Sequence, residues 1–84
     1  MNLDQIFRTA TAFLNEYDLP DTYATALPHE EHPTLALVYA DHRGDELSDQ
    51  LMWESRHDEH EVARITYNGL HITVSTYWGD GGAS

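Results

Sequence analysis

The sequence predicts an α+β domain, in which an N-terminal amphipathic helix packs on one face of a four-stranded antiparallel meander sheet. Two patterns lead to this prediction. Apolar residues follow a helical repeat over residues 3–17, and an Asn-Gly turn near the C-terminus is flanked by alternating apolar residues. We expect one domain over residues 1–78, followed by a flexible, glycine-rich tail over residues 79–84.

The helix is predicted from apolar residues that recur at steps of three and four, which places them on one helical face. They are Leu3, Ile6, Phe7, Ala10, Phe13, Leu14 and Tyr17. Asn2 is a favourable N-cap, and Gln5 stands three residues later, which is the spacing of a capping box. Pro20 ends the helix because it cannot continue the backbone hydrogen bonding.

The hairpin is predicted from residues 67–70, which read Tyr-Asn-Gly-Leu. Asn-Gly readily adopts the positive φ angles of a type I′ turn, and a two-residue loop determines which residues lie opposite each other. The predicted pairs are Tyr67 with Leu70, Ile65 with Ile72 and Ala63 with Val74. Their side chains share one face of the sheet, and Trp78 lies further along the same face.

Two more strands are predicted before the hairpin. Residues 34–40 are apolar at odd and even positions alike, as in a strand with both faces covered. Residues 50–56 alternate, with Leu51 and Trp53 on one side of the strand. If these two residues join the core side, the connection to the next strand must contain three or five residues. Residues 23–27 are a candidate for a short additional edge strand.

The composition is strongly acidic, because 15 Asp and Glu residues oppose four arginines and no lysine, for a formal net charge of −11. This charge disfavours direct nucleic-acid binding and favours a protein partner with a basic surface. A GC-rich genome or a salt-adapted proteome would produce the same acidity without any specific function. The chain has no cysteine and no apolar run that could span a bilayer, so we expect a cytoplasmic protein without membrane contact.

Two motifs place histidines around acids, HEEH at residues 29–32 and HDEH at residues 57–60. Alternate connections of a meander fall at the same end of the sheet, so we expect both motifs at one pole, near Asp80. Imidazole and carboxylate groups suit zinc or a similar metal. The candidate ligands are His29, His32, His57 and His60. Neither motif has a recognised zinc-binding spacing, so the expectation is no cofactor, and a polar rim is the competing interpretation.

The same pole is expected to gather acidic side chains that steer and bind a basic partner. These candidate protein-binding residues are Glu30, Glu31, Asp58, Glu59 and Glu61. A second set combines residues of the uncovered sheet face with Trp78, and its aromatic residues can serve as anchors. It comprises Arg64, His71, Tyr77 and Trp78.

The sequence contains no cysteine nucleophile, no Gly-x-Ser-x-Gly motif and no glycine-rich phosphate loop, so we do not expect an enzyme. The leading hypothesis is a small acidic module that binds and modulates or inhibits a basic partner, in its strongest form as a nucleic-acid mimic. In composition alone the chain resembles phage accessory and immunity proteins. The alternatives are a metal- or small-ligand-binding domain built on the histidines, and a subunit that self-associates through the sheet face or an edge strand.

Overall fold

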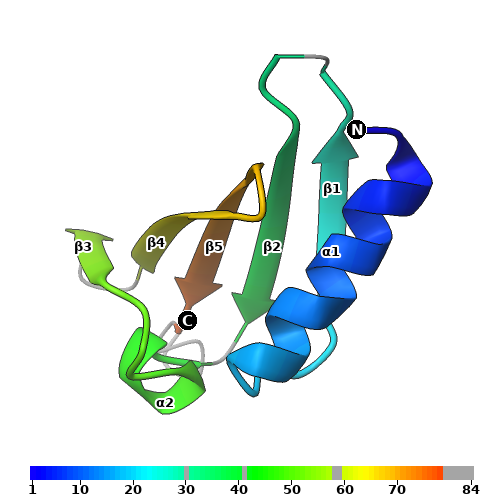
Figure 1. The fold of residues 1–84 in the computed structure, drawn as a ribbon. Coiled ribbons are helices and arrows are strands. Elements are labelled where there is room, and N and C mark those ends of the chain that lie inside the picture. The colour runs from blue at the N-terminus through cyan, green and yellow to red at the C-terminus, as the bar shows by residue number, and fades with distance from the viewer. Residues whose placement is uncertain (30, 41, 58–59, 79–84) are drawn as a thin grey trace.

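The computed structural model describes residues 1–29, 31–40, 42–57 and 60–78 and has one N-terminal helix and a five-stranded mixed sheet (Figure 1). In chain order the elements are α1 (Leu3–Glu16), β1 (Tyr23–Leu27), β2 (Thr34–Ala40), α2 (Gly44–Leu47), β3 (Trp53–His57), β4 (His60–Tyr67) and β5 (Leu70–Tyr77). The predicted tail lies outside the described residues. Within the described ranges, no helix has the length and apolar character needed to cross a membrane.

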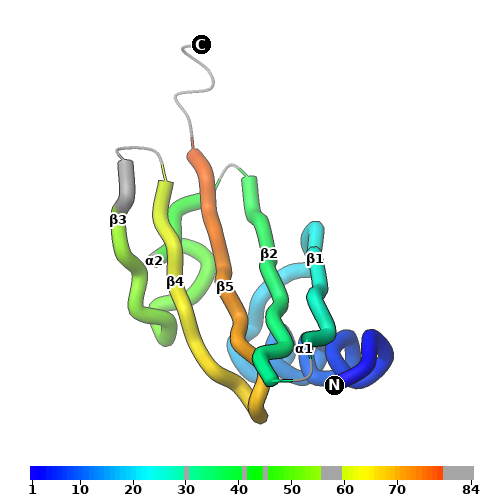
Figure 2. Tube along the Cα trace, turned by 90° about the horizontal axis from the view of Figure 1, so that it is seen from above, coloured from blue at the N-terminus to red at the C-terminus, as the bar shows by residue number. Residues whose placement is uncertain are grey.

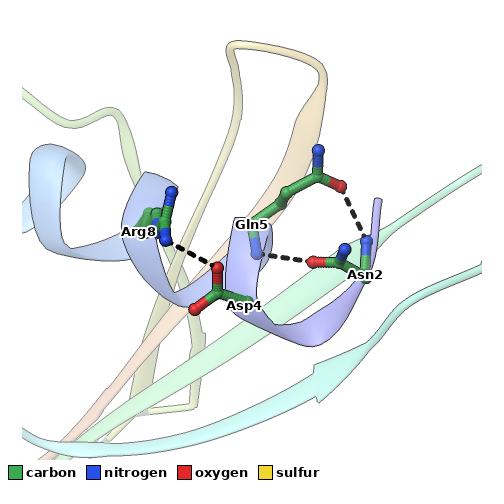
Figure 3. A network of polar contacts seen from close by, with 4 residues as sticks. All are labelled: Asn2, Asp4, Gln5 and Arg8. Atoms are coloured by element: carbon green, nitrogen blue, oxygen red, sulfur yellow. Dashed lines mark hydrogen bonds and ion pairs between the residues drawn. The ribbon is translucent and has the colours of Figure 1, made fainter.

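Helix α1 begins with the predicted capping box (Figure 3). The Asn2 side chain accepts a hydrogen bond from the backbone N–H of Gln5 at 2.8 Å, and the Gln5 side chain accepts one from the backbone N–H of Asn2 at 2.9 Å. Arg8 forms an ion pair with Asp4 at 3.0 Å. The helix ends one residue earlier than predicted. Its buried residues are Ile6, Ala10 and Phe13.

The strand order is β1-β2-β5-β4-β3, which differs from the predicted meander. Strand β2 pairs with β5 in parallel, so that Thr34 lies opposite His71 and Ala40 lies opposite Tyr77. The other neighbouring strands are antiparallel. The α+β class is therefore confirmed, whereas the prediction of four antiparallel strands in chain order is wrong. The long segment from β2 to β5 contains α2, β3 and β4, which provides the length that a parallel crossover requires.

The C-terminal hairpin has the predicted register. Tyr67 lies opposite Leu70, and the turn residues Asn68 and Gly69 have φ angles of 50° and 85°, as a type I′ turn requires. The next two pairs are also as predicted: Ile65 with Ile72, and Ala63 with Val74. The hairpin presents these side chains to the core that forms between the sheet and α1.

Strand β3 keeps its predicted core side through a bulge. Trp53 lies opposite Ala63, but the register shifts between Ser55 and His57, so that His57 lies opposite His60. The extra residue in β3 reverses the sides of the sheet on which the following residues lie. Trp53 therefore reaches the core side without the odd-numbered connection that was expected. The residues of that connection, 58–59, lie outside the described residues.

Both helices lie on one face of the sheet, and the described residues include no element that covers the other face (Figures 1 and 2). Helix α2, which the sequence analysis does not predict, packs beside β3. Trp53 donates a hydrogen bond from Nε1 to the Ser48 carbonyl at 2.8 Å. The backbone of Gly44 lies directly against the Trp53 ring. The result is a two-layer domain with one open sheet face.

Candidate protein-binding surface

Strand β2 is apolar on both sides, but only one side is covered. Its odd-numbered residues are buried under α1: Leu35, Leu37 and Tyr39. Its even-numbered residues from position 36 onward are exposed on the open face: Ala36, Val38 and Ala40. The sequence pattern is that of a strand with two covered faces, whereas the described residues include one long helix, which covers only one of them. This mismatch makes the open face the main candidate site.

Further apolar side chains extend this surface onto the neighbouring strands. Tyr23 and Leu27 of β1 are 87% and 62% exposed, and Tyr77 of β5 is 46% exposed. The register places Tyr23 beside Val38, and Ala40 beside Tyr77. We call this surface the apolar face; it consists of Tyr23, Leu27, Ala36, Val38, Ala40 and Tyr77, and the uncharged Thr25 and Thr34 lie among them.

Charged residues are absent from β1 and β2, although the whole chain has a formal net charge of −11. On the open face, charged side chains begin on β4 and β3, where Arg64 forms an ion pair with Glu54 at 3.1 Å. The centres of protein interfaces are typically depleted in charge and enriched in aromatic residues. The β1–β2 half of the open face has this character.

Two of the aromatic candidates are held by neighbouring side chains. The Tyr77 ring stacks on His60, with centroids 4.2 Å apart and planes 10° apart. The Arg43 guanidinium lies 5.4 Å from the centroid of the Trp78 ring, in cation–π geometry. Side chains that are already ordered lose less conformational entropy when a partner binds, so both rings are suited to a contact surface.

Arg64 and His71 lie exposed on the open face, at the positions that the hairpin register predicts for them. His71 lies at the end of β5 that is next to the start of β2, whereas Tyr77 lies at the other end. The strand positions of these residues are thus established, and their role in binding stays a prediction.

The two histidine motifs do not share a pole. Thr34, which follows HEEH, lies opposite His71 at one end of β5, whereas His60 lies opposite Tyr77 at the other end. His57 lies opposite His60 at that same far end. The prediction that the motifs are neighbours is therefore wrong. It assumed that β2 runs antiparallel to the next strand in sequence, and the parallel pairing with β5 moves the start of β2 to the end of the sheet that holds the Asn-Gly turn.

The predicted acidic cluster is divided for the same reason. Glu31 is exposed before β2, whereas Glu61 is half-buried on the core side of β4 and accepts a hydrogen bond from the backbone N–H of Gly44 at 3.4 Å. The Glu61 carboxylate therefore holds α2 against the sheet. Four predicted residues lie outside the described residues: Glu30, Asp58, Glu59 and Asp80.

The structure brings a different set of histidines together. The rings of His29 and His32 stack with centroids 5.9 Å apart, and His32 lies 6.0 Å from His71. Nδ1 of His29 accepts hydrogen bonds from the backbone N–H groups of Glu31 and His32, each at 3.2 Å. In the part of the chain that the structure describes, no group of three or more His, Cys, Asp or Glu side chains is arranged to hold a metal ion.

An open, mainly apolar hollow of about 460 Å³ lies beside these histidines. Its lining residues are Leu27, Pro28, His29, His32 and Thr34. Because Leu27 belongs to both surfaces, the hollow continues the apolar face at the end where β1 leads into β2.

Sequence reasoning missed Tyr23, Leu27 and Val38 as site residues. The signal was present in residues 35–40, which are apolar at odd and even positions alike, because one helix cannot cover two faces of a sheet. Comparisons with protein-family models, with curated proteins and with solved structures find no match.

Proposed function

We propose that this chain is a small, non-catalytic protein-binding module whose partner packs on the apolar face and presents a basic surface around it. The single observation that carries the proposal is strand β2, whose exposed residues Ala36, Val38 and Ala40 are all apolar although no described element covers them. Burial of apolar surface contributes about 25 cal/mol per Å², so a partner that covers this face would be bound by the ordinary hydrophobic effect.

The charge of the chain supports a basic partner. An excess of carboxylates accelerates encounter with a positively charged protein and disfavours other partners. Basic surfaces are common on proteins that bind nucleic acid. A module that occupies such a surface would inhibit the protein that carries it. The proposal places this interaction in the cytoplasm, which is consistent with the lack of cysteine.

The test is capture of a partner from a cell lysate by the tagged chain and by two variants of equal charge. Val38→Glu places a carboxylate in the apolar face, and Gln50→Glu places one at an exposed site elsewhere. We expect the wild type and Gln50→Glu to retain a basic protein that is released between about 0.1 and 0.5 M salt, because salt screens exposed charges. We expect Val38→Glu to lose that protein while it melts cooperatively.

Equal capture by all three chains would contradict the role of the apolar face. If the folded wild type captures no basic protein, the proposal itself is wrong. Circular dichroism melting of each variant separates loss of binding from loss of folding.

A second candidate function is binding of a small apolar ligand in the hollow beside His29 and His32. The observation that favours it is the combination of an apolar lining with two imidazoles at the rim. A screen of small aromatic carboxylates by two-dimensional NMR tests it. Amide shifts confined to Leu27 and His32 would support this candidate, and unchanged spectra would oppose it.

A further inference from the structure

The outer main-chain groups of edge strand β1 can be identified from the hydrogen bonding of β2. The Pro33 carbonyl accepts a hydrogen bond from the backbone N–H of His71 at 3.0 Å, so odd-numbered residues of β2 direct their main-chain groups toward β5. The main-chain groups of the even-numbered β2 residues therefore point toward β1. The register pairs these residues with odd-numbered residues of β1. The N–H and C=O groups of Ala24 and Ala26 therefore point away from the sheet.

Strand β1 lacks the charges, the proline and the bulge that often protect a sheet edge. Its five residues, Tyr23–Leu27, include no charged residue and no proline, and their register with β2 continues without a bulge. Four of the five are exposed. The opposite edge strand, β3, contrasts with it, because β3 has a bulge and the charged residue Glu54. Of the two edge strands in the described part of the chain, β1 is therefore the more open template for another strand.

Helix α1 extends beyond β1, and this offers apolar surface to an added strand. In both views the first turns of α1 lie outside the edge of the sheet (Figures 1 and 2). Leu3 and Phe7 belong to these turns and are each 49% exposed, although the helical repeat places them beside the buried stripe. A strand paired with β1 would extend the sheet over this part of the helix and reduce the exposure of both side chains.

We infer that the partner contributes an extended segment that joins the sheet as a sixth strand beside β1, an inference that rests on the proposed function. The charges at the two ends of β1 indicate the chemistry of that segment. Asp18 and Asp21 precede the strand and Glu31 follows it, and all three are exposed. An apolar segment with lysine or arginine at each end would match this arrangement.

A second copy of the chain fits the same edge poorly. Antiparallel pairing of two β1 strands brings the Asp21 end of one copy next to the Glu31 end of the other, and parallel pairing brings Asp21 next to Asp21. Each copy also has a formal net charge of −11. Like charges brought next to each other oppose association of two copies. Charge therefore favours a basic segment of another protein over a second copy of the chain.

The probe is a synthetic nine-residue peptide with two lysines at each end and alternating valine and threonine between them. Its control has glutamate in place of each lysine. We expect the lysine peptide at saturation to slow amide hydrogen exchange of Ala24 and Ala26 by about tenfold or more, because their N–H groups gain acceptors. We expect the glutamate peptide to leave their exchange unchanged.

A pair of variants at one position tests the main-chain contact. Ala24→Pro removes an outward N–H and leaves the hydrogen bonds between β1 and β2 in place, whereas Ala24→Val retains that N–H. We expect the proline variant to bind the lysine peptide about tenfold more weakly, as the loss of one main-chain hydrogen bond and the bulk of the ring imply. We expect the valine variant to bind like the wild type. Thermal melting confirms that both fold.

Three results would overturn the inference. Protection of Ala24 and Ala26 that rises with protein concentration, without peptide, would identify a second copy as the occupant. Peptide-induced shifts confined to Val38 and Tyr77 would show binding on the apolar face without strand addition. The absence of any response to the lysine peptide would exclude the stated chemistry. In the last two cases the separate capture experiment with Val38→Glu decides whether the proposed function is correct.

Discussion

The carboxylate of Glu61, on β4, accepts a hydrogen bond at 3.4 Å from the backbone N–H of Gly44, the first residue of α2. The two residues are 17 positions apart in the chain, and their contact holds the four-residue helix α2 against the sheet. Sequence reasoning assigned Glu61 to a partner-binding pole because it belongs to the acids around the two histidine motifs. The structure assigns it to the internal framework of the domain.

Replacement of Glu61 by alanine should therefore affect stability. We expect Glu61→Ala to lower the free energy of unfolding by about 1 kcal/mol, the usual contribution of such a hydrogen bond. Denaturant unfolding measures this change. Glu31→Ala is the control, because Glu31 is exposed, and it should leave the free energy of unfolding unchanged. Unaltered stability of Glu61→Ala would contradict the structural role.

Gly44 has no room for a side chain. A Cβ at this position would lie 2.5 Å from Cγ and 2.7 Å from Cε2 of Trp53, so the indole ring must move in Gly44→Ala. We expect loss of the 2.8 Å hydrogen bond from the ring to Ser48, a change in tryptophan fluorescence, and a loss of about 1–3 kcal/mol in the free energy of unfolding, as overpacking typically causes.

Gly69→Ala provides the matched comparison for Gly44→Ala. Nothing lies within 4 Å of a Cβ at Gly69, but its φ of +85° is unfavourable for any other residue. We expect about 1 kcal/mol of destabilisation, with the fluorescence of Trp53 unchanged. If Gly69→Ala altered the fluorescence as Gly44→Ala does, steric contact with Trp53 would not be the cause.

The separation of the two histidine motifs predicts independent responses to metal. His29 and His32 lie at one end of the sheet and His60 at the other, so one ion cannot bind all of them. In a zinc titration followed by NMR of the imidazole rings, we expect the signals of His60 to change independently of those of His32. We also expect His60→Ala to leave the zinc response of His29 and His32 unchanged. Identical titration midpoints at both ends, abolished by His60→Ala, would contradict the observed strand order.

The Tyr39 hydroxyl predicts a loss of stability at alkaline pH. Burial, with a smaller effect of the nearby Asp21 carboxylate, raises the pKa of Tyr39 from 10.0 to about 12, and the neutral hydroxyl donates to the Pro20 carbonyl at 2.6 Å. The unfolded chain releases this proton more readily than the folded chain. The stabilisation is therefore complete below pH 10 and declines as the pH rises from 10 to about 12.

Denaturant unfolding across this range of pH measures the effect, and Tyr39→Phe is the control because it lacks the ionisable group. We expect the stability of the wild type to fall more steeply with pH than that of Tyr39→Phe. Parallel curves for the two proteins would show that Tyr39 has the same pKa in the folded and unfolded chains.

Elements whose signals are local were predictable in detail. The capping box of α1 involves residues three positions apart, and the turn at Asn68 and Gly69 depends on two residues with positive φ. The hairpin register follows from that turn and from alternating apolar residues. Trp53 does lie on the core side, but a bulge takes the place of the odd-numbered connection that this position was expected to require, and no local pattern in β3 indicates the bulge.

The sequence by itself determined the α+β class, the helix with its buried stripe, the C-terminal hairpin and the acidic charge of the chain. Only the tertiary structure decided that β2 pairs with β5 in parallel, which separates the histidine motifs and makes β1 an edge strand, and that Glu61 contacts α2. The physical reason is that residues 34–40 are apolar on both sides of the strand. This pattern specifies neither the neighbouring strand nor whether the two strands pair in parallel or antiparallel. Long-range packing against α1 and the hairpin makes that choice, and it leaves half of the apolar surface of β2 exposed.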